Sequence, residues 1–209
     1  MRLVMPPDKL EGEDVDTKVE AVVNNVLRIH KARPGKTQMI FADMGVNPTE
    51  WGYSVYDDVI QRLVDGGIPR ERIANFATLE GEKRQAAAGK LQEGEYWIAI
   101  GSTGKLGTGV NAQRYLTALH HLDIAWVPSA IEQRNGRGHR QHNTNKEVEV
   151  HYYVTEGTFD LVMWQAVARK MKSIQQFLKG STARIIRMED TGDEDSGELS
   201  PEMIMASVS

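Results

Sequence analysis

Short apolar segments of strand length alternate along this chain with longer segments of helical periodicity, and this alternation restricts the fold more than any other feature. Residues 37–42, 96–101 and 118–124 are short and apolar, as expected of buried strands. The other elements follow from apolar spacing, with helices over 17–32, 53–65, 80–91, 128–136 and 158–178 and weaker strands over 72–77 and 147–155. This order predicts an α/β fold, a parallel sheet with helices on both faces.

The charge is distributed unevenly and predicts three segments. The 209 residues carry a net charge of −4 and no cysteine, which excludes a disulfide framework, a thiolate zinc site and a cysteine nucleophile. Residues 1–16 and 188–209 are acidic, whereas residues 17–187 hold 23 basic and 17 acidic side chains. We therefore expect an acidic N-terminal lead-in, a folded body with a charge of +6, and an acidic, mobile tail. The basic body is compatible with a polyanionic partner but does not require one.

The chain shows no pattern for export or membrane insertion. No apolar run approaches the ~18 residues of a membrane span, and no signal-peptide pattern opens the sequence. We therefore expect a cytoplasmic protein without a membrane segment.

A glycine-rich loop follows the strand predicted over 96–101. It runs from Gly101 to Gln113 with four glycines, and Ser102, Thr103 and Lys105 add hydroxyl and ammonium donors. In parallel α/β sheets ligands bind beyond the carboxyl ends of the strands, and glycines let backbone amides approach a phosphate. The loop therefore indicates an anion site, and a tight turn needed only for packing is the alternative.

Three arginines recur every three residues in and after the helix predicted over 128–136. They are Arg134, Arg137 and Arg140. Guanidinium is suited to bidentate phosphate contact, and this spacing can aim two such groups at one target. The alternative is a solvated basic face, although Gly136 and Gly138 interrupt the segment where a plain surface helix would not favour them.

These segments, in this order, resemble motifs IV, V and VI of superfamily 2 helicases. The matching segments are Ile40–Ala42, Ser102–Asn111 and Gln133–Arg140. The run Leu122–Gln133 is similar to the Swi/Snf branch, and residues 118–123 and 154–165 resemble the C-terminal part of large methylase–helicase polypeptides of phages and mobile elements. The resemblance covers nearly the whole chain and implies the second, C-terminal RecA-like lobe of a DNA-dependent ATPase.

The resemblance also implies roles at the nucleotide. Arg137 and Arg140 would act as arginine fingers on the γ-phosphoryl group of ATP, and Gln133 would position these arginines or the nucleotide. Gly109 and Asn111 match positions that face the ribose.

A second set of implied roles concerns partners. Ser102, Thr103 and Lys105 would contact a DNA phosphate. The implied partners are DNA, an N-terminal RecA-like lobe of the same polypeptide, and a methyltransferase domain. Closing and opening of the two lobes would then convert hydrolysis into stepping along DNA.

The chain lacks the elements that hold a nucleotide in a complete motor. Gly35-Lys36-Thr37 matches the end of a P-loop, but His30 stands where the first glycine is required, and the segment precedes a strand instead of following one. No acidic magnesium box ends an apolar strand. We therefore expect ATP and Mg²⁺ to bind only together with a missing N-terminal lobe, and the isolated chain to be inactive.

Two further interpretations concern metals and an alternative function. His120 and His121 are neighbours on a predicted strand and point to opposite faces, so no metal site is expected.

The alternative to a motor lobe is a non-catalytic DNA-binding or scaffold module of a DNA methylase polypeptide. The two arginines Arg137 and Arg140 argue against that alternative, because a scaffold has no need of them.

Overall fold

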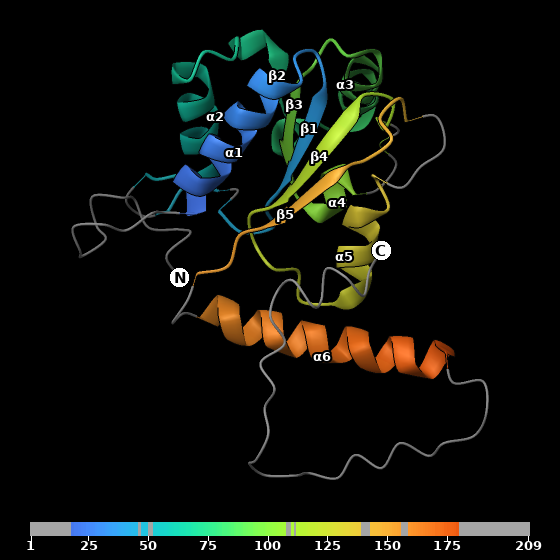
Figure 1. Ribbon diagram of the computed structural model, residues 1–209. Coiled ribbons are helices and arrows are strands. Elements are labelled where there is room, and N and C mark those ends of the chain that lie inside the picture. Colours follow the sequence, from blue (N-terminus) through green and yellow to red (C-terminus); the bar gives the residue numbers. More distant parts are fainter. Residues whose placement is uncertain are drawn as a thin grey trace.

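Five parallel strands form the centre of the fold, in the order β2-β3-β1-β4-β5 (Figure 1). The computed structural model describes residues 18–45, 47–49, 52–107, 110, 112–138, 143–155 and 159–179, without the side chains of residues 159 and 173–179. The strands are β1 (Thr37–Phe41), β2 (Ile73–Asn75), β3 (Ile98–Gly101), β4 (Leu116–His121) and β5 (Glu149–Tyr152). All four strand pairings are parallel.

Helices cover both faces of the sheet and one end of it. They are α1 (Lys18–Ala32), α2 (Val55–Asp65), α3 (Gly81–Glu93), α4 (Thr103–Leu106), α5 (Pro128–Asn135) and α6 (Phe159–Lys179), with short 3-10 turns at Arg70–Arg72 and Phe76–Thr78. In Figure 1, α1 and α2 lie on one side of the sheet and α3 on the other. Helix α6 lies beyond the carboxyl ends of the strands, next to α5.

The alternation of side chains along β1 explains the two main apolar cores. Ile40 packs with the valines of α1 and the apolar face of α2. Met39 and Phe41 point to the opposite face, where they pack with Leu91 of α3 and Leu106 of α4. A third cluster joins α5 to α6 through Ile131 and Trp164. Because both faces of β1 are covered, all five of its residues are buried.

The ends of the helices follow their sequence signals. Ser54 caps α2, since its side chain accepts a hydrogen bond from the amide of Asp57 at 3.3 Å. Gly94 ends α3 with a φ of 80°, a left-handed conformation that glycine adopts without strain. Helix α6 begins at Phe159, so its expected cap, Thr158, lies outside the described residues.

The observed elements confirm the predicted α/β architecture with small shifts of the boundaries. The strand predicted over 118–124 runs from Leu116 to His121, because the chain turns at Leu122 to reach α5. The weak strand predicted over 72–77 has only three strand residues and continues as a 3-10 turn. The segments expected to flank the folded body, 1–16 and 188–209, lie outside the described residues. Within the described part of the chain, no helix combines the length and apolarity needed to cross a membrane.

Candidate functional site

The carboxyl ends of β1, β3 and β4 meet at one buried arginine. Arg134, in the last turn of α5, has no solvent-exposed surface. Its Nη2 donates to Asp43 Oδ2 at 2.7 Å and to Asp123 Oδ1 at 2.9 Å, and its Nε donates to Thr103 Oγ1 at 2.8 Å. Its Nη1 donates to the Asp123 carbonyl at 3.0 Å and to His121 Nδ1 at 3.4 Å. All five N–H donors of the guanidinium are therefore engaged.

Two aspartates compensate the buried charge of Arg134. Asp43 follows β1 and Asp123 follows β4, so adjacent parallel strands bring both carboxylates to the same edge. Asp123 is buried, and it also accepts hydrogen bonds from the amides of Asp43 and Met44. Burial raises the pKa of Asp123, and the charge of Arg134 opposes that shift. Burial also acts to raise the pKa of Asp43, but the amide of Thr103 and the charge of Arg134 outweigh it, so this pKa lies below its usual range.

The glycine-rich loop is tied to this cluster at its first turn. Ser102 caps the one-turn helix α4, because its Oγ accepts a hydrogen bond from the amide of Lys105 at 3.3 Å. The Thr103 hydroxyl donates to Asp43 Oδ2 at 2.8 Å, and the Thr103 amide donates to Asp43 Oδ1 at 2.6 Å. The start of the loop is therefore fixed to the end of β1 and, through Arg134, to α5.

The carbonyl of Gly107 joins the same loop to two of the predicted nucleotide-site residues. Gln133 Nε2 donates to this carbonyl at 3.1 Å, and Arg137 Nη2 donates to it as well. Arg137 Nη1 also donates to the Val110 carbonyl at 2.7 Å. A Cβ on residue 107 would lie 2.3 Å from the Thr103 carbonyl oxygen, so only glycine fits there. This shared acceptor keeps the loop against α5.

Burial excludes a solvated basic face for the first two arginines of the run. Arg134 is fully buried and Arg137 is only 6% exposed. Gly136 is the C-cap of α5, and in the turn that follows it the amide of Arg137 donates to the Arg134 carbonyl. The two guanidinium groups have different acceptors: Arg134 binds carboxylates, and Arg137 binds main-chain carbonyls.

Other predicted site residues are only partly covered by the structure. Gly109, Asn111 and Arg140 lie outside the described residues. Lys105 is placed, and its Nζ lies 3.1 Å from Glu80 Oε1 at the start of α3. The roles assigned to all these residues at ATP or DNA stay predictions.

The sequence reasoning missed the residues that hold the site together. Asp43 and Asp123 were not among the predicted site residues, and Arg134 was named only as one of three arginines suited to phosphate contact. Asp43 directly follows the strand predicted over 37–42, and Asp123 lies near the end of the strand predicted over 118–124. A signal was present, because polar residues at the carboxyl ends of neighbouring parallel strands converge. Among the described residues, no group of three or more metal-ligating side chains is found.

The carboxylates of this edge are engaged by an arginine and are not arranged to bind a metal ion. Mg²⁺ prefers carboxylate and water oxygens, but the carboxylates of Asp43 and Asp123 are bound to Arg134. Gln133 and Arg137 bring amide and guanidinium donors to the glycine-rich loop, where both bind the Gly107 carbonyl.

Two buried histidines on β4 predict that stability falls at acidic pH. Burial, assisted by the charge of Arg134, lowers the pKa of His121 to about 3, and burial holds the pKa of His120 well below its usual range. Both rings stay neutral in the folded state, and His120 is bound by Tyr153 and Gln38. The unfolded chain takes up protons below about pH 6.5, so the free energy of unfolding should fall by roughly 1.4 kcal/mol per pH unit for each histidine.

Urea unfolding at several pH values between neutrality and about pH 5 checks this expectation. The variant His121→Gln should lose about half of the pH dependence that the two β4 histidines contribute, because one of their two rings is gone. An unfolding free energy that stays constant over this range would contradict the neutral state of the two rings.

Known proteins with similar sequences are phage and helicase proteins, and the chain matches only a small part of each. It is 33% identical over 152 residues to defense against restriction protein B of Escherichia phage P1, which covers 73% of this chain and 6% of that protein. It is 30% identical over 105 residues to the human DNA annealing helicase and endonuclease ZRANB3, which covers 49% of this chain and 9% of that protein. The chain thus spans less than a tenth of the length of these relatives, and no family model matches it.

Solved structures with a similar fold include part of an ATPase domain and a DEAD-box protein. The C-terminal part of the Fun30 ATPase domain superposes with a TM-score of 0.57 at 18% identity, over 77% of this chain and 48% of that one. The E. coli DEAD-box protein SrmB, solved bound to the regulator of ribonuclease activity A, gives a TM-score of 0.54 at 14% identity, over 74% of this chain and 81% of that one. The chain has an α/β RecA-like fold. No methyltransferase is named among these proteins, so the association with one stays a prediction.

Proposed function

We propose that this chain is the C-terminal lobe of a DNA-dependent ATPase that translocates along DNA. The observation that carries the proposal is the junction between the glycine-rich loop and α5, made by Arg134 through Thr103 and by Gln133 and Arg137 through Gly107. This junction connects the loop expected at DNA to the helix expected at ATP. Similarity to parts of an annealing helicase and of an ATPase domain supports the same assignment.

In this function, ATP lies between the present lobe and an N-terminal lobe that carries the P-loop and binds Mg²⁺. Arg137 and Arg140 stabilise the negative charge that develops on the transferring phosphoryl group. Gly109 and Asn111 face the ribose, and Gln133 positions the arginines while it holds the loop through Gly107. Ser102 and Lys105 lie on the DNA path, and the buried Thr103 between them holds the loop in place through Asp43 and Arg134.

Exposed apolar side chains beside the site suit the partner lobe. Trp126 is 63% exposed and Val127 is 50% exposed, and both closely follow Asp123 in the chain. Met44 is also exposed, and its amide donates to Asp123 Oδ2 at 2.8 Å. Large exposed apolar side chains are found at surfaces that pack against another domain.

The experiment that tests the function joins this chain to the upstream region of its natural polypeptide. The two-lobe protein should hydrolyse ATP and do so faster with DNA, whereas the present chain alone should neither bind ATP tightly nor hydrolyse it. A two-lobe protein that folds and binds DNA without any ATP turnover would instead favour a non-catalytic module of a larger polypeptide. Turnover by the purified present chain, abolished by Arg140→Ala, would contradict the half-motor assignment.

The role of Lys105 can be measured from the salt dependence of DNA binding. Glu80 should compete only weakly with DNA for the ammonium group of Lys105, because the Glu80 side chain is 84% exposed and their ion pair is weak. In the two-lobe protein, Lys105→Ala should reduce the slope of log affinity against log salt by about 0.9, since one phosphate contact is lost. DNA-stimulated turnover should fall more than basal turnover.

The variant Glu80→Gln is the matched control, because it removes the partner of Lys105 and keeps the ammonium group. It should leave the salt slope unchanged or make it steeper. An unchanged slope in Lys105→Ala would mean that Lys105 belongs to a packing turn and not to the DNA site.

A further inference from the structure

The amino ends of the strands form a second polar edge, opposite the candidate site. Main-chain hydrogen bonds connect this edge across the sheet: the amide of Trp97 donates to the Arg72 carbonyl at 2.8 Å, that of Gln38 to the Trp97 carbonyl at 2.8 Å, and that of Thr37 to the Tyr115 carbonyl at 2.9 Å. The residues that precede β2, β3, β1 and β4 therefore lie side by side, in that order, along the amino edge of the sheet.

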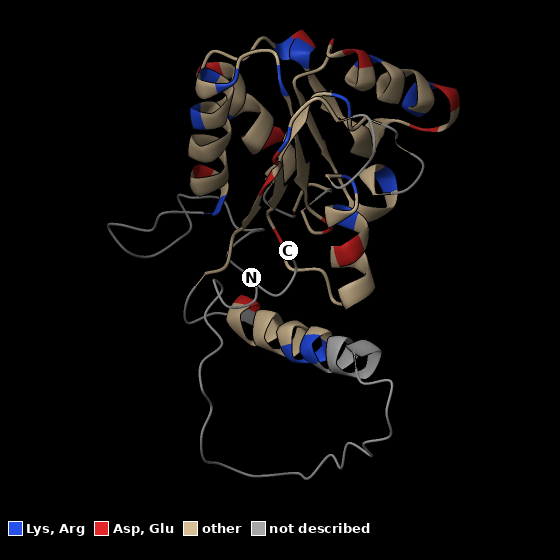
Figure 2. Cartoon of the chain, turned by 45° about the vertical axis from the view of Figure 1, so that its right-hand side comes forward, with Lys and Arg blue, Asp and Glu red and all other residues tan. Residues whose placement is uncertain are grey.

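Basic side chains follow this line. We call them the amino-edge basic band, and its members are Lys36, Arg70, Arg72, Lys90 and Arg114. Glu71 and Glu95 are the acidic residues interspersed with them, so the band has a local charge of +3 in a chain with a net charge of −4. Figure 2 shows basic positions in blue along this edge, at the top of the view, with acidic positions between them.

Aromatic rings hold most of these cations without neutralising them. Three rings, of Trp97, Tyr96 and Tyr115, lie at the same edge. The contacts to ring centroids are 5.0 Å from Arg72 to Trp97, 6.0 Å from Lys90 to Tyr96, 5.7 Å from Lys36 to Tyr115 and 5.3 Å from Arg114 to Tyr115. A ring face attracts a cation through its quadrupole and carries no compensating charge. The cations are thus positioned and remain available to an anion.

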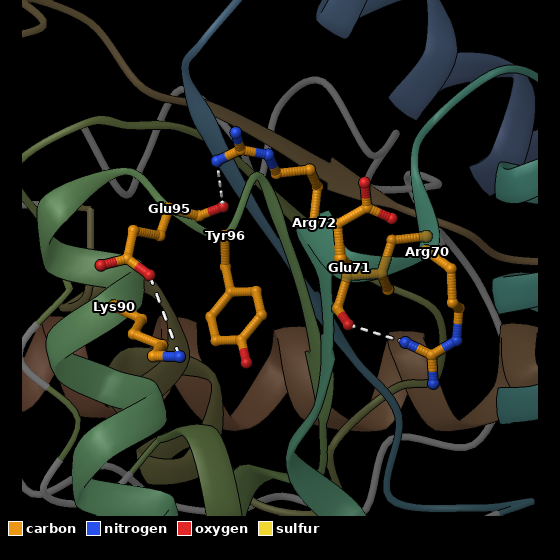
Figure 3. Close-up of a pocket in the computed structure, with 7 residues that line it drawn as sticks. Arg70, Glu71, Arg72, Lys90, Glu95 and Tyr96 are labelled. Atoms are coloured by element: carbon orange, nitrogen blue, oxygen red, sulfur yellow. Dashed lines mark hydrogen bonds and ion pairs between the residues drawn. The ribbon is translucent and has the colours of Figure 1, made fainter.

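A hollow of about 770 Å³ lies at one end of the band (Figure 3). Figure 3 shows Tyr96 between Lys90 and Arg72. Arg72 Nη1 donates to the main-chain carbonyl of Glu95 at 2.8 Å, which fixes the guanidinium without pairing its charge. The carboxylate of Glu95 lies 3.9 Å from Lys90 Nζ, and both side chains are about half exposed, so this ion pair is weak.

We propose that the amino-edge basic band binds the phosphate backbone of DNA, as a contact separate from the one at the glycine-rich loop. The strand β4 is six residues long and spans about 20 Å, which separates the two edges of the sheet. The same phosphates therefore cannot serve both surfaces. This contact goes beyond the proposed motor function, since it needs neither ATP nor the N-terminal lobe.

The salt dependence of DNA binding by the present chain tests the proposal. The double variant Lys36→Gln/Arg114→Gln removes two surface cations that share the Tyr115 ring. With a short DNA duplex, the slope of log affinity against log salt should decrease by about 1.8, because two phosphate contacts are lost. The matched control is Lys170→Gln/Lys172→Gln, which removes the same charge from exposed positions on α6 and should leave the slope unchanged.

Circular dichroism confirms that each variant is folded before the titrations are compared. Lys36→Arg keeps the charge and should keep the slope, which separates a charge effect from a change in packing. Equal slopes for the test variant and the α6 control would overturn the proposal, and so would a failure of the unmodified chain to bind DNA at low salt. The ATPase measurement on the two-lobe protein is independent of these outcomes, so the two proposals can fail separately.

Discussion

Replacing Arg140 by alanine in the two-lobe protein should lower ATP turnover by at least ~10³ while DNA affinity stays nearly unchanged. The physical reason is that an arginine finger acts on charge that develops only in the transition state, so its loss affects the rate and not the binding of DNA. Steady-state kinetics with saturating DNA measure the turnover, and a DNA titration without ATP measures the affinity.

Arg137→Ala should show the same loss of turnover together with a loss of stability. Its guanidinium donates to the carbonyls of Gly107 and Val110, and removing a charged donor from buried acceptors costs about 1.5–3 kcal/mol. If either alanine variant loses DNA binding but keeps basal turnover, the arginine concerned contacts the phosphate backbone of DNA and is not a finger.

Replacing Arg134 by alanine should destabilise the lobe by about 3–5 kcal/mol, because it leaves the buried carboxylate of Asp123 without its cation. Urea unfolding of the present chain measures this change. Arg134→Lys keeps a charge but cannot reach five acceptors at once. The free energy of unfolding of this variant should therefore lie between that of the wild type and that of the alanine variant. If the alanine variant does not fold, the lysine variant still gives a measurable change.

The pair of Arg62 and Asp58 on α2 provides a control at the same distance. Arg62 Nε lies 2.7 Å from Asp58 Oδ1, and Arg134 Nη2 lies 2.7 Å from Asp43 Oδ2, but the Arg62 side chain is 36% exposed. Water and salt screen an exposed pair, so Arg62→Ala should cost no more than about 1 kcal/mol. If Arg62→Ala and Arg134→Ala lowered the free energy of unfolding by similar amounts, the buried cluster around Arg134 would not be what stabilises the carboxyl edge of the sheet.

The architecture was predictable from the sequence because its signals are local. The apolar stripe of α1 and the uninterrupted apolar run of β1 depend only on neighbouring residues, and both elements match their predicted ranges closely. Helix α4 was not predicted, because a single turn of four residues has no periodicity to detect. The position of β2 at the edge of the sheet was also not predicted, since strand order depends on long-range pairing.

The motifs could be recognised in the sequence, but the network that joins them could not. The structure brings Gln133 and Arg137 to the Gly107 carbonyl of the glycine-rich loop, and their roles at the nucleotide stay predictions. The ion pairs of Arg134 could not be predicted. Its partners Asp43 and Asp123 lie 91 and 11 positions away from it in the chain, and no sequence spacing identifies such contacts. The roles of Gly109, Asn111 and Arg140 rest on the motif resemblance alone.

The central place of β1 has a consequence for how this lobe is made on the ribosome. Both neighbours of β1 are formed later in the chain, since β3 begins at Ile98 and β4 at Leu116. At a synthesis rate of ~5–20 residues per second, the wait for the ~60 residues up to β3 lasts roughly 3–12 s. During that time α1 and α2 can cover only one face of a strand whose five residues are all buried in the finished lobe. Translation speed between residues 42 and 97 is therefore expected to influence the yield of folded protein.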